Sequence, residues 1–324
     1  MNPQRAGQHW FDDVQLDRLG AGHIHDTYLA VTGGEEFVLQ RINSVVFTDP
    51  GLVMAQTHRL LAQWRQQSIY AAPELIASKR GALGEWVDGE YWRVWGFLAD
   101  TIVVDPIESI AQARAAGRAF AELQASLAQM QGPTFRDPIE GFLQLDHYLQ
   151  DYDNLAGAAP AGLRALVQAH RHLAVQFAQR NAHIHGDCKI NNLLFDPVGE
   201  HVVAVIDFDT AMYGHWAWDF GDLVRSVCFS RGRVDVEYFA ACLTGFAEHQ
   251  PLTSAAESVA APGYVALMLG VRFLSDHLNN DRYFRVARHG ENLTRAEEQF
   301  ALFESFEGLR GELVDAAAEV CAGA

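Results

Sequence analysis

Short runs of alternating apolar and polar residues dominate the first third of the chain. They fill residues 14–46 and return over 81–100, and a two-residue period is typical of half-buried strands. A Gly-Gly pair at 33–34 and an Asp-Gly pair at 88–89 separate such runs, and both pairs are typical of tight hairpin turns. The pattern predicts a small antiparallel sheet.

One helical segment interrupts these strands, and longer ones follow them. Asp49 as N-cap and Pro50 at the first helical position precede an apolar period of three and four residues that continues to residue 67. We therefore expect an α+β protein of two lobes: a sheet with one helix over 1–100, and a larger, mainly helical lobe over 101–324. A ligand cleft is expected between them. The helical period returns at 107–130, 160–180, 234–250, 261–280 and 294–320.

Composition narrows the classes of partner. The apolar content of 49% is ordinary and allows a sizeable core. The formal net charge is −17, and Lys79 and Lys189 are the only lysines, so no basic patch is offered to nucleic acid or to an anionic membrane. The acidity fits a soluble, self-repelling surface, with an electrostatic funnel for a cationic substrate as the alternative.

The cysteines and the apolar runs indicate a cytoplasmic protein. Four cysteines are scattered along the chain without a CxxC pair or a metal-ligand spacing, as reduced cytosolic thiols are. The beginning of the chain has no apolar segment of a secretory signal. The longest apolar run, residues 263–271, is too short to cross a bilayer.

Candidate chemistry is concentrated in residues 183–210, which read HIHGDCKINNLLFDPVGEHVVAVIDFDT. Asp187 and Asn192 stand in the spacing H-G-D-x-x-x-x-N, and Asp207 follows at the end of a buried strand. Phosphoryl transfer needs such a set: an aspartate to accept a hydroxyl proton, with an amide oxygen and a second carboxylate to hold Mg²⁺. Lys189 could place its ammonium on the phosphoryl group in transfer. The alternative is a polar loop packed for structure.

This segment resembles the catalytic loop of the aminoglycoside phosphotransferase / choline kinase superfamily, distant relatives of the protein kinases. Further stretches resemble one branch, the N-acetylhexosamine 1-kinases, which phosphorylate the anomeric hydroxyl of GlcNAc or GalNAc: GHIHDTYLAV, FVLQRINSVVF, IDFDTAMYG, DFGDLVRS, RFLSDHLNNDRYF and NLTRAEEQF. The resemblance runs from about Leu19 to Phe300. It implies a protein-kinase-like two-lobe fold, with ATP and Mg²⁺ as cofactors.

The same resemblance assigns roles to residues of this chain. Asp187 would be the catalytic base in contact with the acceptor, and Asn192 and Asp207 would be the Mg²⁺ ligands. Arg272 and Tyr283 match positions that hydrogen-bond the sugar. These five residues would therefore lie around one site.

On the nucleotide side, the resemblance implies two elements of the sheet lobe. The turn GAGHIHDTY, with Gly22, His23 and Thr27, would cover the phosphates. The stretch WGFLA, with Trp95 and Phe97, would be the hinge that reads adenine. The glycine-rich turn is equally typical of a hairpin without a ligand.

One position departs from the superfamily pattern. The nucleotide lysine usual on the third strand is replaced by Gln40, with Arg41 beside it, and the next helix lacks the glutamate that pairs with such a lysine. Strand alternation sends Gln40 and Arg41 to opposite faces, so only one of them can point into the cleft. Gln40 stands at the strand position of the usual lysine, whereas Arg41 carries the positive charge that this lysine would supply. Asp209 and Asp222 also match motif positions, either as supports or as ligands.

Structural alternatives exist for the two sugar-side residues as well. Arg272 has the spacing of a helical ion pair with Asp276, four residues on. Tyr283 has the character of an amphipathic side chain that covers a helix end. Either alternative would remove the residue from the acceptor site.

Three functions are consistent with the sequence. The first is an ATP- and Mg²⁺-dependent kinase of the anomeric hydroxyl of a hexosamine, with a nucleotide and a small sugar as its partners. The second transfers to another hydroxyl: an aminoglycoside, an amino alcohol, homoserine, or a protein serine or threonine. The third is a nucleotide-binding pseudokinase, which the missing strand lysine suggests and the intact Asp187, Asn192 and Asp207 oppose.

Overall fold

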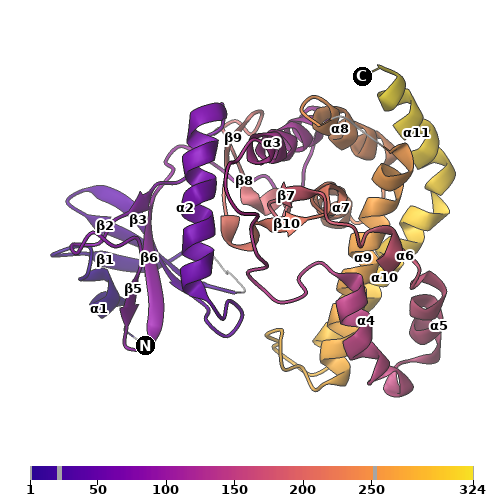
Figure 1. Ribbon diagram of the computed structural model, residues 1–324, viewed down its shortest axis with the longest axis horizontal. Coiled ribbons are helices and arrows are strands. Elements are labelled where there is room, and N and C mark those ends of the chain that lie inside the picture. The colour runs from indigo at the N-terminus through magenta and orange to yellow at the C-terminus, as the bar shows by residue number, and fades with distance from the viewer. Residues whose placement is uncertain (1, 20–23, 251–253, 324) are drawn as a thin grey trace.

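A six-stranded antiparallel sheet forms one end of the molecule and helices form the other (Figure 1). The computed structural model describes residues 2–19, 24–250 and 254–323. The strand order is β1-β2-β3-β6-β4, with β5 paired to β6. The strands are β1 (Gln15–Arg18), β2 (Asp26–Thr32), β3 (Glu35–Ile42), β4 (Leu75–Ile76), β5 (Glu85–Val87) and β6 (Glu90–Gly96).

Both predicted hairpins are confirmed. Gly33 and Gly34 join β2 to β3 with φ of 58° and 86°, and Asp88 and Gly89 join β5 to β6 with φ of 54° and 80°. Two consecutive left-handed residues give the turn a twist that matches the twist of the paired strands. Glycine adopts that backbone without strain, and aspartate tolerates it better than most residues.

The two faces of this sheet pack against different partners. On the outer face, Trp10 and Phe11, which follow the short helix α1 (Pro3–Gly7), form a small core with Leu39 and Trp92. On the inner face lies α2 (Pro50–Gln67), whose N-cap Asp49 accepts a hydrogen bond of 2.9 Å from Leu52 N as predicted. The structure thus adds α1 to the single helix expected here, because five residues are too few for a periodic signal.

The helices of the C-terminal part differ from the predicted segments at several boundaries. The segment 160–180 divides into two helices around Arg171 and His172, and the segment 294–320 divides at Leu309. Two further helices, α4 and α7, were not predicted. The helices are α3 (Ile110–Ala128), α4 (Leu145–Asp153), α5 (Ala161–His170), α6 (Leu173–Gln176), α7 (Trp216–Ser230), α8 (Val236–Ala247), α9 (Ala255–Leu278), α10 (Glu291–Gly308) and α11 (Arg310–Gly323).

Helix α9 is the one described helix that is long and apolar enough to cross a membrane by length and composition. It extends the apolar run of residues 263–271, which by itself is too short to span a bilayer. Within the protein, 78% of the 18-residue apolar stretch of this helix is buried. Helix α9 therefore has the burial of a core helix, with α7, α10 and α4 packed around it.

Four short strands among the helices bring two distant segments together. These are β7 (Ala182–Ile184), β8 (Leu193–Phe195), β9 (Val202–Val205) and β10 (Met212–Gly214). Strand β8 pairs antiparallel with β9, so the residue before β8 lies beside the residues after β9. Strand β7 pairs antiparallel with β10, so the loop after β7 lies beside the residues before β10. Both segments of the candidate chemistry thus meet at one place.

Candidate active site

Asp187, Asn192 and Asp207 come together at the ends of these strands. Asn192 ends a single turn of 3-10 helix before β8, and its side-chain amide donates to the backbone oxygen of Asp187 at 2.7 Å and to Asp187 Oδ2 at 3.0 Å. Ile206 N donates to Asn192 O at 3.0 Å, which brings the turn after β9 alongside. An amide fixed through its NH₂ group keeps its oxygen for a cation.

Asp207 is a solvent-accessible carboxylate with no cation of the described residues on it. Its backbone is left-handed, with φ 64° and ψ 65°, a conformation that costs free energy outside glycine. Among residues 2–19, 24–250 and 254–323, none makes a hydrogen bond or ion pair with the Asp207 side chain. Partial desolvation by the surrounding protein, together with the charges of Asp209 and Asp187, raises the pKa of Asp207. Hard divalent cations prefer carboxylate and amide oxygens that no protein cation occupies, so Asp207 and the Asn192 amide oxygen fit such a cation.

Asp187 has the opposite electrostatic character. Burial favours its neutral form, but the ammonium of Lys189, 2.9 Å from Oδ2, outweighs burial and lowers the pKa of Asp187. The Asp187 charge in turn raises the pKa of Lys189, so both groups are ionised at neutral pH. A general base must be ionised to accept a proton. The arrangement can therefore take a proton from a hydroxyl held against Asp187.

Backbone anchors hold this loop in place. The carboxylate of Asp219 in α7 accepts from the backbone N–H groups of His185 and Gly186 at 2.8 Å each, and from Gln124 Nε2. His185 is fully buried, lies 3.0 Å from Ile206 O, and accepts from Asp187 N, so it ties the loop to the end of β9. Gly186 has φ 82°, and a Cβ there would lie 2.5 Å from the carbonyl oxygen of Thr210.

Asp222 and Cys188, two further residues of the motif region, are both buried. Asp222 is a buried support, since Arg225 donates to its Oδ1 at 2.9 and 2.7 Å. Burial and the nearby Asp187 charge still raise the pKa of Asp222, against the effect of Arg225. Burial also raises the pKa of the Cys188 thiol well above its ordinary value, so Cys188 is a packed side chain and no nucleophile.

A buried ion pair connects the sheet to the candidate site. Arg93 on β6 donates to both oxygens of Asp209 at 2.6 Å, and His25 Nε2 lies 2.9 Å from the same carboxylate. Burial opposes ionisation of Asp209, but Arg93 and His25 outweigh it and hold its pKa far below the ordinary value. Protein groups thus neutralise the charge of Asp209. Among the described residues, none does the same for Asp207, two residues earlier in the chain.

The register of β3 separates Gln40 from Arg41. Gln40 faces inward, where its Oε1 accepts from Arg93 at 3.0 and 2.6 Å and its Nε2 donates to Thr27 Oγ1 at 3.2 Å. Arg41 faces outward and is bound to Asp26 and Glu90 at 2.7–2.9 Å. The position of Arg41 therefore does not support the alternative in which Arg41 binds the nucleotide phosphates. Gly22 and His23 lie outside the described residues.

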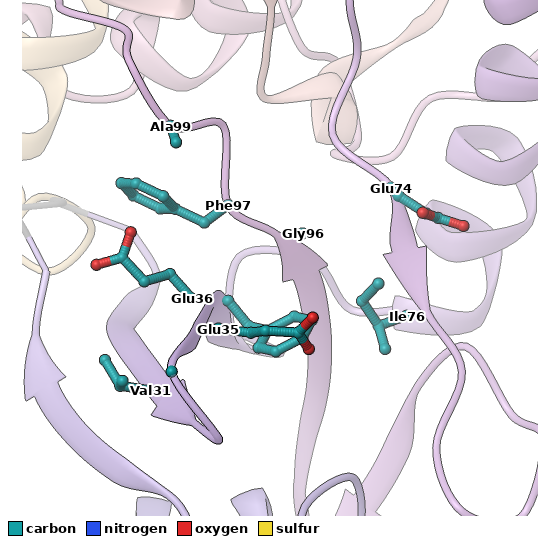
Figure 2. Close-up of a pocket in the computed structure, with 10 residues that line it drawn as sticks. Val31, Glu35, Glu36, Glu74, Ile76, Gly96, Phe97 and Ala99 are labelled. Carbon is teal, nitrogen blue, oxygen red and sulfur yellow. The ribbon is translucent and has the colours of Figure 1, made fainter.

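The predicted hinge residues have different surroundings. Trp95 is buried in the main core, where Arg93 stacks 4.7 Å from its ring and its indole donates to Gln40 Oε1 at 3.3 Å. Phe97 is 37% exposed and lines a cavity of about 530 Å³ between the β2–β3 turn and the ends of β4 and β6 (Figure 2). Three glutamates also line this cavity, so its walls suit no triphosphate. They are Glu35, Glu36 and Glu74.

Arg272 lies within a set of aromatic rings, and it forms no ion pair with the residues that the structure describes. Its guanidinium carbon is 4.9–5.7 Å from the ring centres of four residues, one of which is Tyr283. No carboxylate of the described residues pairs with it, and Asp276 instead accepts from Tyr283 N and Phe284 N at 2.8 and 2.9 Å. The expected alternative of an Arg272–Asp276 pair is wrong. The other three rings are those of Phe142, Tyr148 and Phe284.

Three residues of the site were not found from the sequence. Arg93 is the single charge within the otherwise apolar second half of β6, and such an arginine requires a buried acid. That signal could have identified it, although not Asp209 as its partner. His25 and Asp219 carry no comparable signal, because each contacts residues far from it in sequence.

The fold and the arrangement of carboxylates define a phosphotransferase with a kinase-like two-lobe fold. The chain belongs to the phosphotransferase enzyme family APH, whose family model matches residues 15–252. The enzyme class is therefore phosphoryl transfer to a hydroxyl group.

Solved structures confirm the kinase-like fold. The microcompartment-associated aminopropanol kinase is similar with a TM-score of 0.69 and 19% identity, over 95% of this chain and 97% of that chain. An aminoglycoside phosphotransferase from Alicyclobacillus acidocaldarius gives 0.64 and 14%, over 98% and 97%. A thermostable mutant of aminoglycoside phosphotransferase APH(4)-Ia, in ternary complex with ADP and hygromycin B, gives 0.52 and 17%, over 91% and 95%.

Proposed function

We propose that this protein is an ATP- and Mg²⁺-dependent kinase that phosphorylates the anomeric hydroxyl of a hexosamine such as GlcNAc or GalNAc. The observation that carries the catalytic part is the contrast between two close carboxylates: Asp187 is ionised beside Lys189, and Asp207 is accessible and has no cation partner among the described residues. The first suits a base and the second suits a metal ligand.

The proposed mechanism gives each of these side chains a defined role. Asp187 accepts the proton of the acceptor hydroxyl as its oxygen attacks, and the 3.0 Å hydrogen bond from Asn192 keeps the carboxylate oriented. Lys189 is close enough to offset negative charge on the group in transfer. Mg²⁺, held by Asp207 and the amide oxygen of Asn192, would neutralise charge on the nucleotide phosphates. A hemiacetal hydroxyl is more acidic than an ordinary alcohol, so a base whose pKa is lowered suffices.

The nucleotide is proposed to lie between the sheet and the loop of Asp187. The neighbour with bound ADP supports a nucleotide in this fold. Gly22, His23 and Thr27 remain the proposed cover of the phosphates, and Phe97 the residue at the adenine. Gln40 and Trp95 are proposed to act indirectly, since the side chains of both contact Arg93.

The acceptor preference rests on Arg272. A guanidinium without a carboxylate offers its donors to neutral oxygens, such as sugar hydroxyls or an acetamido carbonyl. A polycationic aminoglycoside would be repelled by the same group. The aromatic rings around Arg272 also resemble an ammonium cage, but the arginine itself occupies it. Tyr283 is half exposed beside Arg272 and is proposed to contact the sugar.

A second acceptor class has one observation in its favour. The aminopropanol kinase has the same fold over nearly the whole of both chains. Transfer to an amino alcohol uses the same base and metal ligands, and only the residues at the acceptor differ. The acceptor is therefore the point that an experiment must decide.

A panel of acceptors with ATP and Mg²⁺ tests the proposal through ADP release. GlcNAc and GalNAc should turn over, ahead of glucosamine, galactose, aminopropanol, homoserine, choline and kanamycin. The Asp187→Asn variant should lose about 10²- to 10⁴-fold in turnover while it still binds ATP. Turnover with aminopropanol alone would replace the sugar by the second class. An active Asp187→Asn variant would remove the base from that residue.

Two coarser features complete the proposal. The lobe boundary is proposed near residue 100, in the segment between the end of β6 and the start of α3. A cytoplasmic location is proposed because all four cysteines are free and three of them are buried.

A further inference from the structure

A group of metal-binding side chains lies in the segment between α9 and α10, apart from the residues around Asp187. His277 is in the last turn of α9, Asp281 follows three residues after that helix, and His289 lies just before α10. One ligand atom from each lies within 4.8 Å of the other two. His289 Nδ1 is 3.3 Å from Asp281 Oδ2, and His277 Nδ1 is 4.0 Å from Asp281 Oδ1.

From this geometry we infer a second metal site, for a divalent transition cation such as Zn²⁺, formed by His277, Asp281 and His289. Two imidazole nitrogens and one carboxylate oxygen are ligands that Zn²⁺ accepts, with a fourth position left for solvent. Ligand atoms about 2.1 Å from a tetrahedral metal are about 3.4 Å apart, so small side-chain rotations bring these three into range. Mg²⁺ prefers oxygen ligands and is a poor occupant.

The charge and hydrogen bonding of the group support a cation. The side chain of Asp281 is 8% exposed, and no arginine or lysine of the described residues pairs with it; its ion-pair partners there are the two histidines. His277 Nδ1 is buried and has no hydrogen-bond partner among the described residues. A buried carboxylate facing an unsatisfied ring nitrogen costs free energy, and one cation between them satisfies both groups.

The segment also holds Asp281 in position before any metal binds. Asn292 Nδ2 donates to Asp281 Oδ1 at 2.9 Å and to Asp276 Oδ2 at the same distance. Asp281 N donates to Asp276 O at 2.8 Å. Asn280 and Asp281 both have positive φ, 63° and 54°, so the backbone is bent to direct this carboxylate. Such outer hydrogen bonds orient the ligands of protein metal sites.

The location indicates what the metal does. Tyr283 and Phe284, between Asp281 and His289, form part of the ring set around Arg272. A cation that joins the end of α9 to the start of α10 fixes both ends of the segment that carries those rings. The role is structural, and it does not depend on the proposed acceptor.

Zinc binding to the full-length protein, purified with chelator and saturated with Mg²⁺, tests the site. Titration calorimetry with ZnCl₂ should give one site per chain, and Zn²⁺ should raise the melting temperature. Co²⁺ in its place should give the visible absorption of a tetrahedral ion without a thiolate charge-transfer band, which excludes the cysteines as ligands. Absence of saturable one-to-one binding would overturn the inference.

Matched variants decide which residues bind. His289→Gln changes an exposed side chain (79% exposed) and should fold normally, yet Zn²⁺ affinity should fall by about 10-fold or more. Asp281→Asn keeps a residue type that tolerates positive φ, and should lose affinity likewise. His58→Gln, at an exposed position on α2, should bind as the wild type does. Asp207→Asn should also keep the zinc site. Unchanged binding by His289→Gln would place the metal elsewhere.

Discussion

Asp207 and Asp209 are two residues apart and have opposite electrostatic surroundings; Asp209 is buried, whereas Asp207 is accessible to solvent. Asp209 is neutralised by Arg93 and His25, and its pKa is lowered; Asp207 lies among carboxylates, and its pKa is raised. Asp209 thereby ties the sheet to the helical part through a bond between groups 116 residues apart. Protein groups pair with Asp209, which fits a structural role, while Asp207 is the acid proposed to bind a cation from outside the chain.

The largest expected effect comes from Asp207→Asn. The variant loses the carboxylate proposed for Mg²⁺, so kcat should fall about 10³-fold at saturating Mg²⁺ and ATP. Because Asp207 has no protein partner among the described residues, the melting temperature should be unchanged or higher. Steady-state ADP release and calorimetry on one preparation measure both. A clear loss of melting temperature would show that Asp207 supports the fold as Asp209 does.

Asp209→Asn should give the converse result. It leaves the Arg93 guanidinium buried without a carboxylate, so the free energy of unfolding should fall by about 3–5 kcal/mol in urea denaturation. The double variant Arg93→Met with Asp209→Leu removes both charges and should be more stable than either single variant. A double variant that loses the sum of both single effects would deny the coupling.

The Arg93–Asp209 pair and the motif of Asp187, Asn192 and Asp207 show how far the sequence predicts the site. The spacing of Asp187, Asn192 and Asp207 was visible, because motif spacing is a local property of the chain. Arg93 was not assigned, since nothing local to β6 names an acid 116 residues away as its partner. Long-range pairs therefore decide which aspartate of the motif region is structural, and only the fold supplies them.

The fold divides in a similar way. The sheet with its two hairpins and α2 could be predicted, because turn residues and a cap mark their ends locally. Helix α7 could not, since 12 of its 15 residues are buried and the polar face that defines an amphipathic period is missing. The break at Leu309 was also invisible, because the apolar period continues across it into α11.

The acceptor side gives a smaller expected effect than either aspartate. Arg272→Met keeps the stem among the aromatic rings and removes the donors, so KM for the hexosamine should rise about 10- to 100-fold with kcat changed less. Arg272→Lys should not restore KM, because an ammonium lacks the planar donor fork. Equal KM values for wild type and Arg272→Met, at unchanged melting temperature, would remove Arg272 from the acceptor site.

The smallest expected effect is that of Arg41→Met, which separates the two faces of β3. Arg41 is bound to Asp26 and Glu90 on the outer face, so its loss should cost about 1 kcal/mol of unfolding free energy and leave KM for ATP within about twofold. Gln40→Ala is the matched change on the inner face, where it removes an acceptor of Arg93 and should lower stability and nucleotide affinity together. If Arg41→Met instead weakened ATP binding and Gln40→Ala did not, the phosphates would lie on the outer face, and the contrast between Asp207 and Asp209 would lose its connection to the nucleotide.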